Sequence, residues 1–139
     1  MAPSSRQPLK THFGRALRRR CPHCGEGAAF LGWWKMRDHC PNCGHKFERE
    51  PGYWVGAVIF NTALVIAAIF ATMAIYLATT WPDVPWTALT VVTVAVSVIV
   101  PSTGYPYART LWMAYDLYVH PLEEGEIAAG RARVRQPNG

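Results

Sequence analysis

The feature that most constrains the fold is a long stretch almost without charge. Between Tyr53 and Ala108 the chain carries a single charged residue, Asp83. The part before Asp83 is longer than the roughly 20 apolar residues that cross a bilayer as a helix. Asp83 itself lies between two prolines, in a sequence typical of a tight turn. The sequence therefore predicts a helical membrane protein built on a transmembrane hairpin, with helices over about 53–80 and 86–107.

The end of the second apolar stretch is less regular. Only fifteen residues run from Trp86 to Val100, which is short for a span, so we expect the helix to continue with a kink near 101–104. Such a break can form a functional cavity, but it is more often a packing kink or the exit of the helix into the interface. Aromatic and apolar residues over 109–120 predict a separate interfacial helix. The last part, 121–139, is acidic and then arginine-rich, and predicts a disordered tail.

The positive charge of the chain lies in its two flanks. Residues 1–52 carry ten Lys and Arg against four Asp and Glu, and residues 109–139 carry four arginines. The turn between the two apolar stretches has no basic residue. By the positive-inside rule, this distribution predicts a multi-pass protein of the inner (plasma) membrane with both termini in the cytoplasm.

The first twenty residues hold six basic residues and no acid. They contain no apolar core like that of a secretory signal peptide. We expect residues 1–20 to be a mobile cytoplasmic arm, with a helical turn around 13–17 and a charge that favours the anionic leaflet. Binding of nucleic acid is the weaker interpretation, because the membrane anchor already explains the charge.

All four cysteines stand in two copies of one motif, Cys-Pro-x-Cys-Gly. Fifteen residues separate Cys24 from Cys40, a spacing typical of a four-cysteine zinc site. In each copy the proline fixes φ in a tight turn and the glycine accepts a positive φ, so that two thiolates can reach one metal. The sequence therefore predicts a zinc-ribbon-like domain over 21–52, with Cys21, Cys24, Cys40 and Cys43 as ligands.

Other chemistries of the cysteines are less consistent with the sequence. Disulfides need an oxidising compartment, whereas the predicted topology places the cysteines in the cytoplasm. A thioredoxin-like redox pair needs a βαβ context, which the sequence lacks. Iron in a rubredoxin-like site is the alternative to zinc, although the segment is short for that fold. His23 and His39 adjoin the cysteines, and we assign them supporting or surface roles because four sulfurs complete the ligand set.

The residues between the two cysteine motifs predict a short β-hairpin or ribbon, which returns the second motif to the first. The residues along the first span predict contacts with other helices or with lipid. A stripe of small residues from Gly56 to Ala78 is compatible with self-association, and equally with a lipid-facing helix. Asn61 is the type of residue that forms a hydrogen bond to a neighbouring helix. Four apolar residues between the motifs are expected to cover the metal or rest at the membrane interface: Phe30, Leu31, Trp33 and Trp34.

No catalytic constellation stands out in the sequence. Asp116 and Glu26 are single acids in polar settings, and we interpret them as surface groups rather than general acids. The sequence therefore favours a protein that is not an enzyme and that serves as a docking or assembly partner for other membrane proteins. The alternatives are a membrane-anchored iron electron carrier and a chaperone or sensor for zinc or copper.

The sequence resembles the bacterial domain-of-unknown-function 983 family of small two-span membrane proteins. The resemblance rests on residues 21–27, the aromatic stretch to Trp34, the second motif within 37–44 and the two apolar spans, and it covers roughly residues 15–118. It implies this fold but no established activity. Respiratory-chain gene neighbourhoods of family members imply a respiratory-chain component as a partner. The junction after Phe47 and the C-terminal tail depart from the family pattern.

Overall fold

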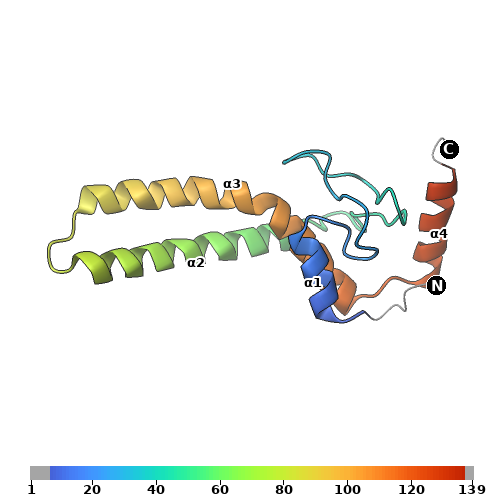
Figure 1. Cartoon of the computed structure of the whole chain (residues 1–139), viewed down its shortest axis with the longest axis horizontal. Helices are drawn as coiled ribbons and strands as arrows, with labels where there is room; N and C mark the ends of the chain where they lie inside the picture. The colour runs from blue at the N-terminus through green and yellow to red at the C-terminus, as the bar shows by residue number, and fades with distance from the viewer. Residues whose placement is uncertain (1–6, 137–139) are drawn as a thin grey trace.

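The computed structural model describes residues 7–136 and contains four helices. Helices α2 (Val55–Thr80) and α3 (Trp86–Val119) form a long antiparallel hairpin (Figure 1). Helix α1 (Leu9–Leu17), the cysteine-containing loops and helix α4 (Glu124–Arg135) gather at the end where α2 begins and α3 ends (Figure 1). We call this end of the molecule the head, and define it as residues 7–54 and 120–136.

The two hairpin helices are long and apolar enough to cross a membrane. With 26 residues, α2 is about 39 Å long at 1.5 Å per residue, more than the ~30 Å of a hydrocarbon core. Apolar side chains cover the outward faces as well as the contact between the helices, and large ones such as Phe70 and Ile75 are exposed. A helix that is apolar all round suits a fully apolar environment rather than the surface of a protein in water.

Close approach of the two hairpin helices depends on glycine. At Gly56 a Cβ atom would overlap the indole ring of Trp112 on α3. At Gly104 a Cβ would stand 2.9 Å from a methyl group of Leu64 on α2. Beside this contact the Asn61 side chain donates a hydrogen bond to the carbonyl oxygen of Pro101 (3.4 Å), so the predicted interhelical role of this residue is confirmed.

Helix α3 is longer than the sequence suggested. The second span and the separate interfacial helix expected over 109–120 form one continuous helix, which passes through Pro101 and Pro106. Its direction changes before its C-terminal part (Figure 1), as the expected kink required. Each proline frees the carbonyl four residues earlier, and long helices tolerate this where neighbouring groups supply new donors. For Pro106 the freed carbonyl is that of Ser102, which accepts a hydrogen bond from the indole of Trp33 (3.4 Å).

Both termini are more ordered than the sequence suggested. The helical turn expected around 13–17 is present as the longer helix α1, which packs against α3 rather than forming a mobile arm, with Ala16 fully buried. Helix α4 replaces the expected disorder over residues 124–135, and begins with a reciprocal capping box between Glu123 and Glu126. Acidic residues in its first turn and arginines in its last turn suit the helix dipole. Residues 1–6 and 137–139 of the expected arm and tail lie outside the described residues.

The expected ribbon between the two cysteine motifs is present in a reduced form. Isolated antiparallel bridges pair Arg20 with Ala28, Phe30 with Met36 and His39 with Lys46, and no longer strand forms within residues 7–136. The bridge at Phe30 encloses a tight turn, closed by a hydrogen bond from the Leu31 amide to the Lys35 carbonyl (2.8 Å). With so few ladder hydrogen bonds, the head depends on side-chain packing and on the cysteines.

Candidate metal centre

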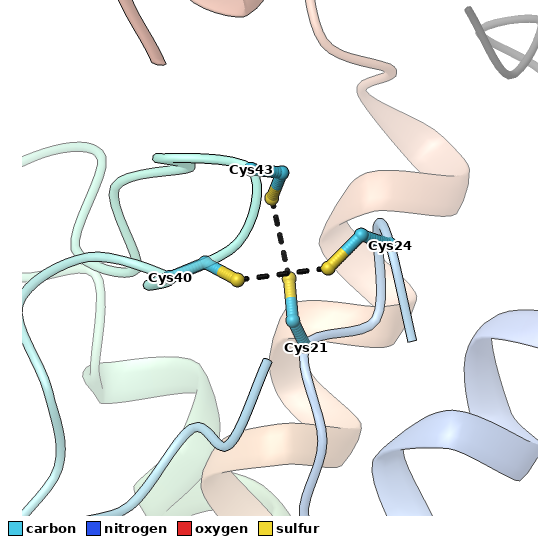
Figure 2. Close-up of side chains that lie close together, drawn as sticks. All are labelled: Cys21, Cys24, Cys40 and Cys43. Carbon is cyan, nitrogen blue, oxygen red and sulfur yellow. Dashed lines mark hydrogen bonds between the residues drawn. The ribbon is translucent and has the colours of Figure 1, made fainter. Parts of the chain in front are cut away.

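The four cysteines form two pairs that are well separated in the sequence, and all four converge on one point in the head. All four Sγ atoms lie within 4.8 Å of one another and none is in a disulfide. The Sγ atoms of Cys21 and Cys43 are 3.9 Å apart, and those of Cys24 and Cys40 are 3.6 Å apart (Figure 2). Sulfurs at ~2.3 Å from a tetrahedral zinc ion would lie about 3.8 Å apart. The cluster is therefore positioned to bind a metal ion.

The two motifs fold into nearly identical turns. The Gly25 amide donates to the Cys21 carbonyl (2.8 Å), and the Gly44 amide donates to the Cys40 carbonyl (2.9 Å). Both glycines have positive φ values, +78° and +69°, which other residues rarely adopt. This is the turn that the proline and glycine of each motif predicted, and we call each turn a knuckle.

A third glycine leaves room for the sulfur cluster itself. A Cβ atom at Gly27 would overlap Sγ of Cys40. Cys21 and Cys40 are buried, whereas Cys24 and Cys43 are partly exposed. A hydrogen bond with Cys21 lowers the pKa of Cys40, and the thiolate is the form of cysteine that binds a metal. Four sulfur donors suit zinc or iron, and neither is distinguished by this geometry.

Each knuckle is held by one of the terminal helices. From α1, His12 donates a hydrogen bond to the carbonyl of Pro22 (2.9 Å), and Arg15 donates one to the carbonyl of His23 (2.7 Å). From α4, Arg133 donates to the carbonyl of Gly44 (3.3 Å). The two segments expected to be mobile or disordered therefore position the cysteines. The charge of these segments did not predict their contacts with the knuckles, because the same arginines also suit a solvated arm.

The cysteines share their apolar core with the hairpin. Cys21 and Cys40 belong to one buried cluster with Ala29, Phe47 and Met113. Met113 is in α3 and is completely buried. A metal bound by the cysteines would therefore also fix the head on the hairpin.

The histidines near the cysteines are outside the sulfur cluster. The His39 side chain is exposed, and His23 packs against His45 with ring centroids 6.2 Å apart. His45, which sequence analysis did not single out, is only 6% exposed and meets Phe47 edge to face. Burial, and then electrostatic repulsion between the two imidazoles of His45 and His23, lowers the pKa of His45 to about 4, so this side chain is neutral at pH 7.

A partly buried ion network lies at the junction of the head and α3. Arg49 donates hydrogen bonds to Asp116 (3.0 Å) and to Glu126 (2.9 Å), and the hydroxyl of Tyr53 donates to Asp116 (3.1 Å). Burial alone would lower the pKa of Arg49, but these two carboxylates outweigh it and raise the pKa. The interpretation of Asp116 as a surface acid is wrong, because its side chain is only 14% exposed. No local sequence signal pairs residues so far apart in the chain.

A cavity of about 200 Å³ opens beside the two outer cysteines, Cys24 and Cys43. His23, His45 and Asn42 line it from the loops, and α4 closes its other side with residues that include Ile127 and Arg131. The outer sulfurs are therefore the part of the cluster nearest to this opening.

The comparison with protein families identifies the class of protein. The profile described as "Protein of unknown function (DUF983)" matches residues 30–116, which is more than half of the chain. The chain therefore belongs to this family, in agreement with the resemblance noted from its motifs. The match includes Cys40, Cys43 and most of the hairpin, whereas the first knuckle precedes it. No curated protein and no solved structure matches the chain.

Proposed function

We propose that this chain is a two-span protein of the inner membrane whose cytoplasmic head binds a structural zinc ion and docks other membrane proteins. One observation carries the proposal: the cysteines and Met113 of α3 share one buried core. A single metal would then give the head a fixed orientation on the membrane helices. A rigid surface at a fixed height above the bilayer suits docking or assembly of a membrane partner.

The size of the head supports a structural role for the metal. About fifty residues before the hairpin bury too little apolar surface to hold a fold alone, and a metal is a common remedy. Two knuckles supplying four sulfurs form the closed ligand set of structural zinc sites, which leave no position for a substrate. The partly buried ion network around Arg49 is self-paired and suits a structural joint. These features favour a protein that is not an enzyme.

Crosslinking of the full chain in native membranes tests the docking function. We expect the wild type to capture one or more membrane proteins, among them a respiratory-chain component, and the Cys24→Ser variant to lose them. The His39→Ala variant is the matched control, since His39 is exposed and outside the sulfur cluster. Identical captures from the wild type and Cys24→Ser would contradict the proposal.

A one-iron electron carrier is the second candidate, favoured by the partial exposure of Cys24 and Cys43 beside an open cavity. Electron transfer needs a metal close to the surface where a partner docks. Elemental analysis and a visible spectrum of the purified protein in mild detergent separate the two candidates. One zinc per chain and no colour supports the structural role, whereas one iron with absorbance that bleaches on reduction supports the carrier. Release of the metal to a chelator within minutes would instead favour a metal chaperone or sensor.

A further inference from the structure

The turn between the two knuckles places exposed aromatic side chains beside α3. Leu31, Trp33 and Trp34 are 56%, 42% and 57% exposed. Trp33 also packs edge to face on Tyr107, with ring centroids 6.5 Å apart, and Trp34 packs on Tyr105 at 5.5 Å. In Figure 1 a loop of the head reaches back alongside α3 toward the hairpin. The exposed aromatics therefore belong to the side of the head that faces the hairpin.

The contact with α3 fixes the height of this turn relative to the hairpin. The indole of Trp33 donates to the carbonyl of Ser102, which Pro106 leaves without its helical donor. Ser102 follows Trp86, at the start of α3, by sixteen residues, or about 24 Å along the helix axis. A hydrocarbon core is ~30 Å thick. With Trp86 at the far interface, Trp33 lies near the cytoplasmic edge of the hydrocarbon.

Positive charge lies on and within the aromatic turn. The guanidinium of Arg19 lies over the rings of Phe30 (5.0 Å) and Trp33 (4.6 Å) and donates a hydrogen bond to the Gly32 carbonyl (2.7 Å). Arg18 and Arg20 flank Arg19 in the chain and are exposed, as is Lys35 within the turn. No acidic residue lies between positions 27 and 37. Aromatic side chains at the hydrocarbon edge with cations beside them complement an anionic headgroup layer.

We propose that residues 30–35 form a membrane-interface anchor that holds the head against the cytoplasmic leaflet. Leu31, Trp33 and Trp34 enter the boundary between headgroups and acyl chains, and Arg18, Arg20 and Lys35 bind the phosphates of anionic phospholipids. This inference rests on the proposed membrane insertion of α2 and α3. Lipid is the occupant that the structure favours over a protein, because the turn is continuous with the apolar outer surface of the hairpin at the same height.

Quenching of tryptophan fluorescence by brominated lipid tests the anchor. The full metal-loaded chain is placed in nanodiscs of equal parts phosphatidylcholine and phosphatidylglycerol, with bromine on the upper acyl carbons of one lipid at a time. Replacing Trp33 and Trp34 by Phe removes two of the six tryptophans and should lower the lipid-quenched emission. Trp34→Phe alone is a milder variant that keeps a ring against Tyr105 and leaves the Trp33 hydrogen bond in place.

The matched variant is the pair Trp81→Phe and Trp86→Phe, at the opposite end of the hairpin. If these residues are quenched by lipid but Trp33 and Trp34 are not, the helices are inserted and the anchor is wrong. If none of the four is quenched, membrane insertion itself is wrong.

Lipid charge provides the second readout. The wild type should be quenched more strongly by brominated phosphatidylglycerol than by brominated phosphatidylcholine. Combined replacement of Arg18, Arg20 and Lys35 by Gln should abolish that difference while the bound metal is retained. Equal quenching by both lipids in the wild type would overturn the assignment of these cations to anionic headgroups.

Discussion

Gly130 of α4 lies directly against Gly44 of the second knuckle, with its carbonyl group where a Cβ atom of residue 44 would stand. In the other direction, a Cβ at Gly130 would approach the carbonyl oxygen of Cys43 to 2.7 Å. Two backbones can come this close only where both residues are glycine. Helix α4 therefore rests on the second knuckle itself, and order in α4 and order at the sulfur cluster should depend on each other.

Gly130→Ala should release α4 from the knuckle, although alanine favours a helix. Overpacking against backbone typically costs about 1–3 kcal/mol, which exceeds the gain of roughly 0.5–1 kcal/mol in helix propensity. Hydrogen exchange of the α4 amides should increase in this variant. Gly125→Ala is the control, because a Cβ there has no neighbour within 4 Å, and it should slow exchange. Slower exchange in both variants would show that α4 is not packed on the knuckle.

Cys24→Ser should reduce the bound metal from one atom per chain to a small fraction, because three sulfurs and a hydroxyl bind zinc or iron far more weakly than four thiolates. Elemental analysis of the purified protein measures this directly. Each of the other three single serine variants should behave in the same way, since the four sulfurs form one cluster. Full metal content in any of them would remove that cysteine from the ligand set.

Chelation of the metal should loosen the head and leave the hairpin helical. Structural zinc contributes on the order of 10 kcal/mol to small zinc domains, and the head has only isolated β-bridges to replace it. Helices α2 and α3 make their backbone hydrogen bonds internally and do not need the metal. Hydrogen exchange should therefore increase across residues 21–50 but not across the middle of α2. A uniform response along the chain would indicate that the head and hairpin unfold together.

Asp116→Asn should destabilise the protein more than Glu126→Gln, although both residues bind Arg49. Asp116 is 14% exposed and also accepts the Tyr53 hydroxyl, so its loss of charge leaves two partly buried donors poorly satisfied, at a cost of about 1–3 kcal/mol. Glu126 is 39% exposed, so solvent screening keeps its contribution below about 1 kcal/mol. Denaturant unfolding of both variants in the same detergent measures the difference. Equal effects would mean that the Asp116 carboxylate is solvated.

Gly56→Ala should weaken the packing of α2 against α3, because the new methyl group would overlap the rigid ring of Trp112. We expect a loss of about 1–3 kcal/mol in hairpin stability. Adding Trp112→Leu should recover part of it, since the smaller side chain makes room for the methyl. The coupling follows from a double-mutant cycle measured by thermal unfolding in detergent. Simple additivity of the two changes would contradict the contact.

The sulfur cluster could be predicted from short segments of the sequence. Each pair of cysteines lies within one tight turn, so proline and glycine at fixed positions specify the shape of a knuckle without distant contacts. The hairpin could be predicted equally well, because a long uncharged stretch interrupted by Pro82 and Pro85 is a local pattern. The ligand role of the cysteines stays a prediction until metal is measured.

The ion network around Arg49 could not be predicted from the sequence. Arg49 and Asp116 are 67 positions apart, and neither has a neighbour in the chain that signals the pairing. The same holds for His45, whose burial depends on packing with Phe47 and His23. Charged side chains usually face solvent, so the sequence favoured a surface role for Asp116.

By itself the sequence determined the two apolar helices, the turn between them and the shape of each knuckle, because periodicity, charge and turn residues act over a few neighbouring positions. Only the tertiary structure decided that α1 and α4 are ordered, since their helices are too short to be stable alone. They fold because distant backbone groups accept their hydrogen bonds: the carbonyl of His23 for Arg15, and that of Gly44 for Arg133. A short polar helix becomes stable where a folded partner supplies contacts that its own sequence cannot.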